Sequence, residues 1–391
     1  VVRVSVSDRS GNRSNVLSWQ FGVGQPLRNV LKIEGKRAYL NGRPWFPIGI
    51  YSYQCHPGDG RFVESGLDQA VAAGFDFALN TKETKEGLDK LLAHGMMCLL
   101  NLGGDMRSAD TESSARRSLL AEGQARFSGH ASVVGYWVDD AENLDNTQGT
   151  PLPEITRTKL EHSLKVLKQD APGRAIVFAI SNLPRLKASA PYCDILLAYR
   201  YPVPQYHPQM LNGWTLKYFD LVVGDYPTWF NSQAFDLGYG ARFKSQEGFR
   251  PTPVEMRAMA YYAVVCGSQG YTAYANNISE KATPQHWREL LRMASEMRYL
   301  APVLAIGDGA ATASLTDEAV SASVKFREYV RGGEHTLIAV NMSGGRVGVT
   351  WGFQQPVRAS VLFEDRIMVG SERTVADVFA PFAVHIYRWE Q

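Results

Sequence analysis

Short apolar segments alternate with helical segments through the middle of the chain. Each apolar segment is rich in aliphatic and aromatic residues and is bounded by turn residues, which is the pattern of a buried strand. The predicted strands cover residues 46–51, 75–80, 96–101, 133–139, 175–181, 195–199, 228–233 and 270–275. Eight strands separated by helices predict an α/β fold, the closed (β/α)8 TIM barrel.

Alternation of apolar and polar residues replaces this pattern at both ends of the chain. At the start, two alternating runs flank a Gly/Asn turn and predict a β-hairpin, the remnant of a preceding sandwich domain. Because the chain begins with this pattern, we expect it to be part of a longer protein. Near the end, alternating runs joined by Gly-rich turns predict a C-terminal antiparallel β-sandwich. We therefore expect three units: an N-terminal hairpin or linker (1–30), a catalytic barrel (31–303) and a C-terminal sandwich (304–391).

A cluster of carboxylates follows the fourth predicted strand. In GHASVVGYWVDDAEN, the acidic residues Asp139, Asp140 and Glu142 come directly after the apolar run. Placing carboxylates beside an apolar core costs free energy unless they are solvated, paired with a cation or hydrogen-bond donor, or required for function. In parallel barrels the carboxyl ends of the strands carry the active site, which favours a functional cluster. The alternative is a helix N-terminus, where acidic residues favour the helix dipole.

Composition and charge narrow the class of protein. The chain has 391 residues, 45% of them hydrophobic, and a net charge of +2, so neither nucleic acid nor an anionic membrane surface is indicated as a partner. No apolar run approaches the roughly 18 residues of a membrane span. The four cysteines are dispersed without a CxxC pair, which favours buried free thiols over a metal cluster. GxSxG, HExxH, Walker and GxGxxG motifs are lacking, so we expect neither metal nor cofactor.

Several segments resemble clan A glycoside hydrolases and their barrel relatives. Their first-strand signature is similar to RAYLNGRPWFPIGIY, and their fourth-strand signature to GHASVVGYWVDDAE. Their seventh-strand region resembles TWFNSQAF and FRPTPVEMRAMAYYAVVCGSQGYTAYA, and the sandwich that follows their barrels resembles LIAVNMS, VLFE and FAPFAVHIYRW. The resemblance implies hydrolysis of glycosidic bonds in a polysaccharide or oligosaccharide, and a secreted or periplasmic location.

Two positions depart from the resembled pattern. The acid of the family is a Glu that aligns with Ala141, and its nucleophile is a Glu at the end of strand seven, where this chain has Gln233. An amide cannot serve as that nucleophile. The chain is therefore either a glycoside hydrolase that uses other carboxylates, or a non-catalytic or engineered-inactive carbohydrate-binding barrel. A structural module of a cell-surface assembly is a weaker third interpretation.

Glycoside hydrolysis needs one carboxylic acid to protonate the leaving oxygen and a second carboxylate as nucleophile or base. Side chains alternate along a strand, and the register of the motif selects Asp140 rather than Asp139 as the acid. For the second carboxylate we favour Glu247, on the loop after strand seven, with Glu142 as its rival. A distant base slightly favours inversion. Further strand-end carboxylates are Glu83, Asp105 and Asp236.

Aromatic and amide side chains gather at the same predicted strand ends. Sugars are bound by flat aromatic faces and by several polar contacts. We predict that a carbohydrate substrate is bound by Tyr51, Tyr53, His56, Asn101, Trp137, Tyr199, Arg200, Tyr201, Gln233 and Asn276. Taken singly, a strand-end Tyr is more often a core residue, and His56 is more often structural. Their common location at one rim is what favours a binding role.

Overall fold

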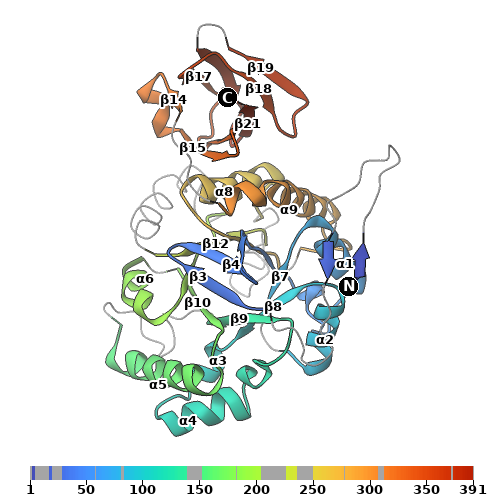
Figure 1. Cartoon of the computed structure of the whole chain (residues 1–391), viewed down its shortest axis with the longest axis vertical. Helices are drawn as coiled ribbons and strands as arrows, with labels where there is room; N and C mark the ends of the chain where they lie inside the picture. Colours follow the sequence, from blue (N-terminus) through green and yellow to red (C-terminus); the bar gives the residue numbers. More distant parts are fainter. Residues whose placement is uncertain are drawn as a thin grey trace, which may run out of the picture.

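Eight parallel strands form a closed barrel at the centre of the protein, seen in the computed structural model of Figure 1. Each strand pairs with the next along the chain, and the last pairs with the first. They are β6 (Ile48–Tyr51), β7 (Phe77–Asn80), β8 (Met97–Asn101), β9 (Val133–Val138), β10 (Ala175–Ile180), β11 (Ile195–Arg200), β12 (Thr228–Gln233) and β13 (Tyr271–Tyr274). The predicted TIM barrel is confirmed, and the bounds of every strand lie within two residues of the prediction.

The structure describes most, but not all, of the chain. The described residues are 2–4, 17–19, 29–57, 59–80, 83–138, 152–181, 183–203, 226–235, 250–276, 278–306, 312–370 and 373–390. Among them, no helix is both long and apolar enough to cross a membrane. All four cysteines are free thiols, as predicted; Cys55 and Cys98 are buried, and the other two are partly exposed.

Helices surround the barrel, and local sequence signals set their ends. Thr252 caps α8 by accepting a hydrogen bond from the Glu255 backbone N–H, while the Glu255 side chain accepts from the Thr252 N–H. Gly74 ends α1 in the left-handed region, at φ 105°. The helices are α1 (Glu64–Ala73), α2 (Lys85–Ala93), α3 (Gly103–Met106), α4 (Glu112–Arg116), α5 (Glu154–Asp170), α6 (Leu183–Ser189), α8 (Pro253–Val265) and α9 (Pro284–Leu304).

A small antiparallel sheet closes the amino end of the barrel. It consists of β3 (Leu31–Glu34), β4 (Arg37–Leu40) and β5 (Arg43–Trp45), which lie across the barrel in Figure 1. The Trp45 ring enters the barrel interior, with its centroid 5.8 Å from that of Phe77 and 5.9 Å from that of Trp229. Its Nε1 donates to Asp76, whose pKa is raised to about 6 by burial. Side chains thus fill the barrel interior at this end.

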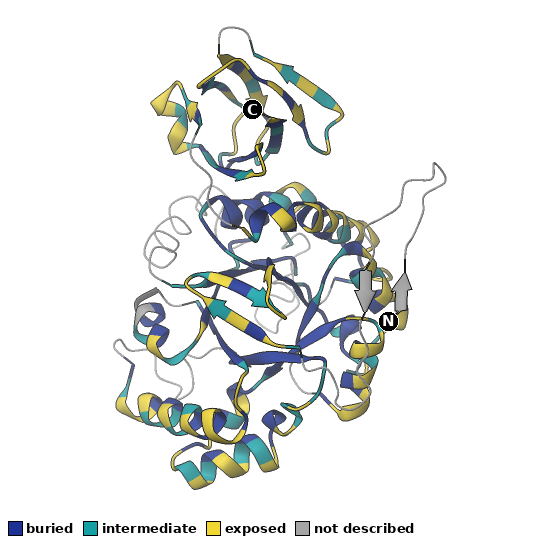
Figure 2. Cartoon of the chain, viewed as in Figure 1, coloured by how far each residue is buried: buried dark blue, intermediate teal, exposed yellow. Residues whose placement is uncertain are grey.

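The C-terminal part consists of two antiparallel sheets, which confirms the predicted sandwich. One sheet has the order β15-β16-β21-β18-β19, the other β14-β17-β20. Figure 2 shows that buried residues line their facing sides as well as the barrel strands. The strands are β14 (Ala313–Leu315), β15 (Val324–Arg331), β16 (Glu334–Asn341), β17 (Val347–Phe353), β18 (Arg358–Val361), β19 (Arg366–Val369), β20 (Thr374–Phe379) and β21 (Val384–Glu390).

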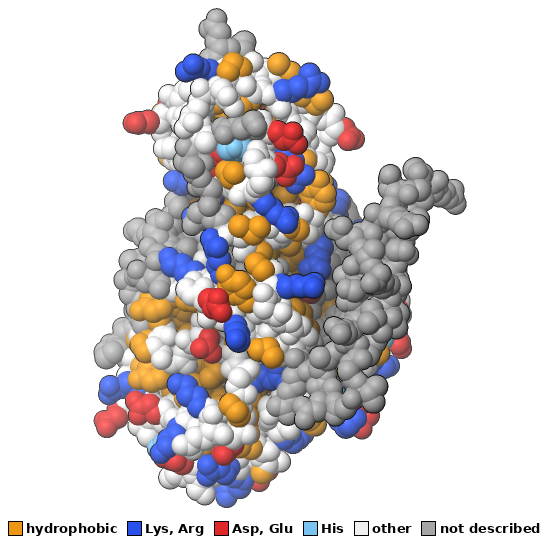
Figure 3. Space-filling model, in the orientation of Figure 1, with side chains coloured by type: hydrophobic (Ala, Val, Ile, Leu, Met, Phe, Trp, Pro, Cys, Tyr) orange, Lys and Arg blue, Asp and Glu red, His pale blue; other side chains and the backbone are white. Residues whose placement is uncertain are grey.

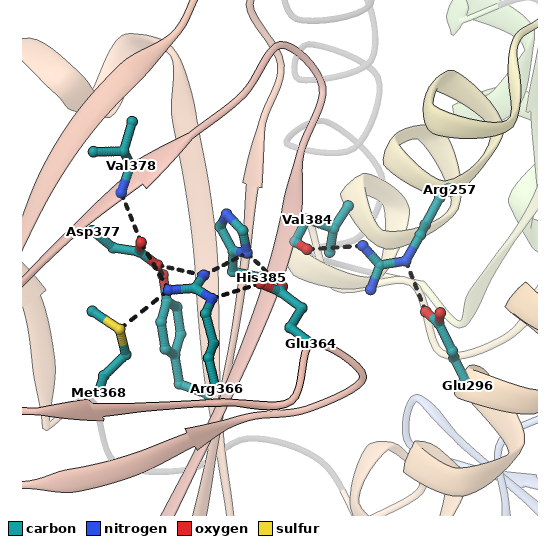
Figure 4. A network of polar contacts seen from close by, with 10 residues as sticks. Arg257, Glu296, Glu364, Arg366, Met368, Asp377, Val378, Val384 and His385 are labelled. Atoms are coloured by element: carbon teal, nitrogen blue, oxygen red, sulfur yellow. Dashed lines mark hydrogen bonds and ion pairs between the residues drawn. The ribbon is translucent and has the colours of Figure 1, made fainter.

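Polar contacts join the C-terminal sheets to the barrel helices. Arg257 of α8 donates from Nε to Glu296 of α9 at 2.8 Å and from Nη1 to the Val384 carbonyl at 2.8 Å (Figure 4). A third contact is the Tyr329 hydroxyl, which donates to the Val264 carbonyl at 3.2 Å. Hydrogen bonds thus hold the C-terminal sheets against the barrel helices.

At the other end of the chain, β1 (Val2–Val4) and β2 (Leu17–Trp19) pair antiparallel, as the predicted hairpin requires. The boundaries proposed at residues 30 and 303 stay predictions.

Candidate active site at the carboxyl end of the barrel

Aromatic rings from opposite sides of the barrel meet at its carboxyl end. Tyr51 ends β6 and stacks on Tyr274 of β13, with ring centroids 4.8 Å apart and planes within 5° of parallel. Trp137 of β9 contacts Tyr51 edge-on at 5.3 Å. Because β9 and β6 are not neighbours in the barrel, this contact crosses the interior. The strand ends therefore converge on one place, as predicted from the sequence.

The cluster continues along β11 and β12 toward the rim. Tyr201 stacks on Tyr199 at 5.2 Å and approaches Tyr274 at 5.3 Å. Phe235, which the sequence did not single out, contacts Tyr201 at 4.9 Å and Tyr274 at 4.7 Å. We call Tyr51, Trp137, Tyr199, Tyr201, Phe235 and Tyr274 the aromatic cluster. Its rim members are partly exposed, so ring faces are available for stacking by a ligand.

Several side-chain polar atoms near the aromatic cluster are buried without a hydrogen-bond partner among the described residues, and two of them bear on ligand binding. In the part of the chain that the structure describes, neither Nε1 of Trp137 nor Oδ1 of Asn276 makes a hydrogen bond. Asn276 itself is held in place, because its Nδ2 donates to the Tyr274 hydroxyl at 2.7 Å. One donor and one acceptor left unsatisfied beside aromatic rings are groups that a hydroxylated ligand can pair with.

A polar pair inside the barrel supports the cluster from below. Asn231 of β12 is buried, accepts from the Thr272 hydroxyl at 2.8 Å and donates to the Tyr201 hydroxyl at 3.3 Å. Asn231 and Thr272 both lie within apolar strands. The alternation of residue types indicates that their side chains point inward, but it does not identify their hydrogen-bond partners. The contact fixes the orientation of the Tyr201 ring.

Gln233 ends β12 where the resembled enzymes have a nucleophile, and its side chain is fully buried. Its Nε2 donates to the Val203 carbonyl at 2.6 Å and to the Phe235 carbonyl at 3.3 Å. Its Oε1 accepts from the Val203 N–H at 3.0 Å. All of these bonds join backbone segments, so a direct contact with substrate would require some of them to break.

His56 and Tyr53 lie beside Tyr51 but differ in accessibility. The His56 ring contacts Tyr51 edge-on at 5.5 Å and is 2% exposed. Burial lowers the pKa of His56 to about 4, although the Asp59 carboxylate opposes this, so the imidazole is neutral near pH 7. Tyr53 is partly exposed, and the Arg61 guanidinium covers one face of its ring at 3.3 Å.

Two other predicted binding residues have local roles. Asn101 ends β8, and its Oδ1 accepts from the Gly103 N–H at 2.9 Å, which supports the start of α3. Arg200 follows Tyr199 on β11. Since Tyr199 packs with the residues of the barrel interior, strand alternation turns Arg200 toward the helix side.

The strand-end carboxylates fall into two groups. Asp105 accepts from the Gln124 backbone N–H at 2.7 Å, which is a structural contact. Glu83 is buried against Gly87 of α2, and burial raises its pKa to about 7, against the lowering effect of the Thr84 backbone N–H. The others lie outside the described residues: Asp139, Asp140, Glu142, Asp236 and Glu247. Within the described residues, no group of three side chains is arranged to hold a metal ion.

The fold of the chain is similar to that of several solved structures. The sequence matches no protein-family model and no curated protein. Solved structures of glycoside hydrolases do align with it. An alpha-amylase from Anoxybacillus aligns with a TM-score of 0.60 and 11% identity, over 88% of this chain and 98% of the amylase. A glycoside hydrolase family 5 protein from Bacteroides vulgatus aligns with a TM-score of 0.59 and 12% identity, over 95% of each chain.

A third neighbour is the GH27 β-L-arabinopyranosidase from Geobacillus stearothermophilus. It aligns with a TM-score of 0.54 and 13% identity, over 89% of this chain and 97% of that enzyme. These alignments extend beyond the barrel strands, because each covers most of both chains. The chain therefore has the barrel fold that glycoside hydrolases of several families share.

Proposed function

We propose that this protein is a glycoside hydrolase that cleaves a polysaccharide or oligosaccharide at the carboxyl end of its barrel. The observation that carries the proposal is the aromatic cluster, together with Nε1 of Trp137 and Oδ1 of Asn276, which have no hydrogen-bond partner among the described residues. Stacking faces beside a free donor and a free acceptor match the apolar faces and hydroxyl groups of a sugar ring. They lie at the end of the barrel where parallel barrels carry their active sites.

Asp140 is the proposed general acid. It follows Val138, the last residue of β9, by two positions in the sequence, and β9 is the strand that carries Trp137. In the reaction its carboxyl proton passes to the glycosidic oxygen as the bond from that oxygen to the anomeric carbon breaks. The adjacent Asp139 favours the protonated form through charge repulsion.

The second carboxylate completes the reaction, and Glu247 is proposed for this role, with Glu142 as the rival. As a base it removes a proton from water while the water oxygen bonds to the anomeric carbon, which inverts the configuration. The bonds that Gln233 makes to the Val203 backbone favour this route, because an amide held in that way offers no nucleophile at the end of β12. Inversion predicts a separation of about 6.5–9.5 Å between the two carboxyl groups.

Release of reducing sugar from a panel of neutral and acidic glycans tests the proposal. Asp140→Asn should lower kcat by about 10²–10⁴ with the fold intact. Its matched control is Asp139→Asn, which removes the neighbouring carboxylate and should retain most of the activity. Wild-type rates in Asp140→Asn would remove this residue as the acid. Glycan binding without turnover by the unmodified chain would instead support a carbohydrate-binding barrel.

A substitution at Ala141 separates the proposal from the acid-deleted interpretation. If Asp140 is the acid, Ala141→Glu should leave kcat within about ten-fold of the unmodified chain, since one acid already serves the leaving group. A gain of several hundred-fold would show that the acid had been absent. The resemblance to secreted hydrolases also supports a proposed extracellular or periplasmic location, which fractionation of the producing cells tests.

A further inference from the structure

A polar cavity lies at the amino end of the barrel, away from the aromatic cluster. It has a volume of about 490 Å³, within the range of small-molecule sites. Its walls come from the turn between β3 and β4, from the segment between α8 and β13, from the end of α9 and from β15 of the C-terminal sheets. We call it the junction cavity, because both the barrel and the C-terminal sheets contribute to it.

The charged side chains around the junction cavity are mostly cationic. Lys36, Arg37 and Arg327 line it, against the single carboxylate of Glu34 among its described lining residues. Figure 3 views this face of the molecule and shows blue Lys and Arg side chains between the β3–β4 sheet and the C-terminal sheets. The lining therefore favours a negatively charged ligand.

Hydrogen bonds hold β15, which forms one wall of the junction cavity, against the barrel. Arg327 donates from Nε to the Val265 carbonyl at 3.2 Å, and the hydroxyl of Tyr329 donates to the adjacent Val264 carbonyl at 3.2 Å. Both carbonyls belong to the last turn of α8, and that of Val264 also accepts from the Gly267 backbone N–H at 2.9 Å. The position of β15 relative to the barrel is thus set without a ligand, so the cavity is preformed.

Neutral groups in the junction cavity suit a hydroxylated ring. Gln269 is one of the lining residues, and its Oε1 is buried without a hydrogen-bond partner among the described residues. Tyr39 contributes a partly exposed aromatic ring, and Trp45 a largely buried one. Sugars bind to proteins through hydrogen bonds from their hydroxyl groups to such acceptors and through stacking on aromatic faces. The volume also exceeds what a simple inorganic anion fills, since one water occupies about 30 Å³.

We propose that the junction cavity is a second saccharide site, which binds a carboxylate-bearing sugar of the hexuronate type. The sugar carboxylate pairs with Arg37, and a ring hydroxyl donates to Gln269. Because the cavity lies at the opposite end of the barrel from the aromatic cluster, the sugar bound here is not the one that is cleaved. A ligand that contacts both the β3–β4 turn and β15 also stabilises the association of the two units.

Calorimetric titration of the full chain with glucuronate, glucose and acetate tests this site. Glucuronate should bind at least about ten-fold more tightly than glucose or acetate, because only it offers both the charge and the hydroxyls. Arg37→Ala and Gln269→Glu should each weaken glucuronate binding by about ten-fold or more. Arg37 is exposed, so its replacement leaves folding intact. The matched control is Arg43→Ala, an exposed arginine of the same small sheet that does not line the cavity.

Each contrary result overturns a defined part of the proposal. If glucose binds as tightly as glucuronate, the site does not recognise the negative charge. If acetate binds as tightly as glucuronate, the site does not recognise a sugar. If both cavity variants bind glucuronate as tightly as the unmodified chain, the ligand does not bind in the junction cavity. The same variants should hydrolyse glycans at the unmodified rate. Asp140→Asn should lose hydrolysis but still bind glucuronate. This result would show that the second site and the proposed function can be tested independently.

Discussion

The carboxamide of Gln233 pairs in both directions with the backbone of Val203. Nε2 donates to the Val203 carbonyl at 2.6 Å, and Oε1 accepts from the Val203 N–H at 3.0 Å. The second Nε2 hydrogen is directed to the Phe235 carbonyl at 3.3 Å. Only an amide can satisfy this set, because a carboxylate has no donor for the two carbonyl oxygens. The residue at the end of β12 is thus suited to joining this strand to the segment that follows β11.

Gln233→Glu should therefore destabilise the protein without creating a nucleophile. We expect a loss of about 1–3 kcal/mol in the free energy of unfolding, since two buried carbonyls lose their donor and face a carboxylate. Urea unfolding measures the loss, and reducing-sugar release should not increase. Gln285→Glu, in the exposed first turn of α9, is the control and should be nearly neutral. A stable and more active Gln233→Glu protein would contradict this account.

Trp137→Phe should weaken substrate binding while the ring contact with Tyr51 is retained. The change removes Nε1, which has no protein partner among the described residues, and leaves an aromatic side chain in its place. KM should rise by about two- to ten-fold with kcat little changed, as expected for one lost hydrogen bond to the substrate. Trp351→Phe, buried in the C-terminal sheets, controls for the loss of volume. An unchanged KM would show that Nε1 does not face the substrate.

His56→Phe should reduce the dependence of stability on acid pH. Burial holds the pKa of His56 at about 4 in the folded protein, against 6.5 for an unperturbed histidine. Between these values the unfolded chain binds the proton more strongly. The contribution to stability is therefore complete above pH 6.5 and is lost as the pH falls toward 4. The loss is on the order of 3 kcal/mol.

Chemical unfolding at pH 7 and at pH 4.5 compares the two proteins. The unmodified chain should lose more stability than His56→Phe over this interval. Parallel loss in the unmodified chain and in His56→Phe would mean that His56 is hydrated in solution.

Arg257→Ala should loosen the contact between the barrel and the C-terminal sheets. It removes the bond to the Val384 carbonyl and leaves Glu296, 4% exposed, with weaker partners. Breaking a buried pair costs about 3–5 kcal/mol, and the Tyr261 hydroxyl and the Arg292 guanidinium that remain beside Glu296 reduce the loss. Thermal unfolding should show a lower midpoint than in Arg288→Ala, an exposed control on α9. Equal midpoints would show that the pair contributes little.

Hydrophobic periodicity was enough to predict the architecture. Strand bounds in the barrel agree with prediction within two residues, because runs such as 133–139 are apolar on both faces and end at polar residues. The antiparallel C-terminal sheets were equally visible, since one face of each strand is solvated and the residues alternate. The convergence of Tyr51 and Trp137 followed from the fold itself, because parallel strands present their carboxyl ends at one mouth.

Partners that are distant in the sequence were decided only by the tertiary structure. Gln233 looked like a substrate ligand, and its bonds to Val203 depend on how the segment after β11 passes β12. The neutral state of His56 depends on burial by other segments, and the junction cavity needs walls from several parts of the chain. Hydrophobic periodicity indicates which face of a helix or strand is buried, because apolar residues gather on the face that avoids water. Hydrogen-bond partners, pKa values and cavities depend on what the rest of the chain places against that face.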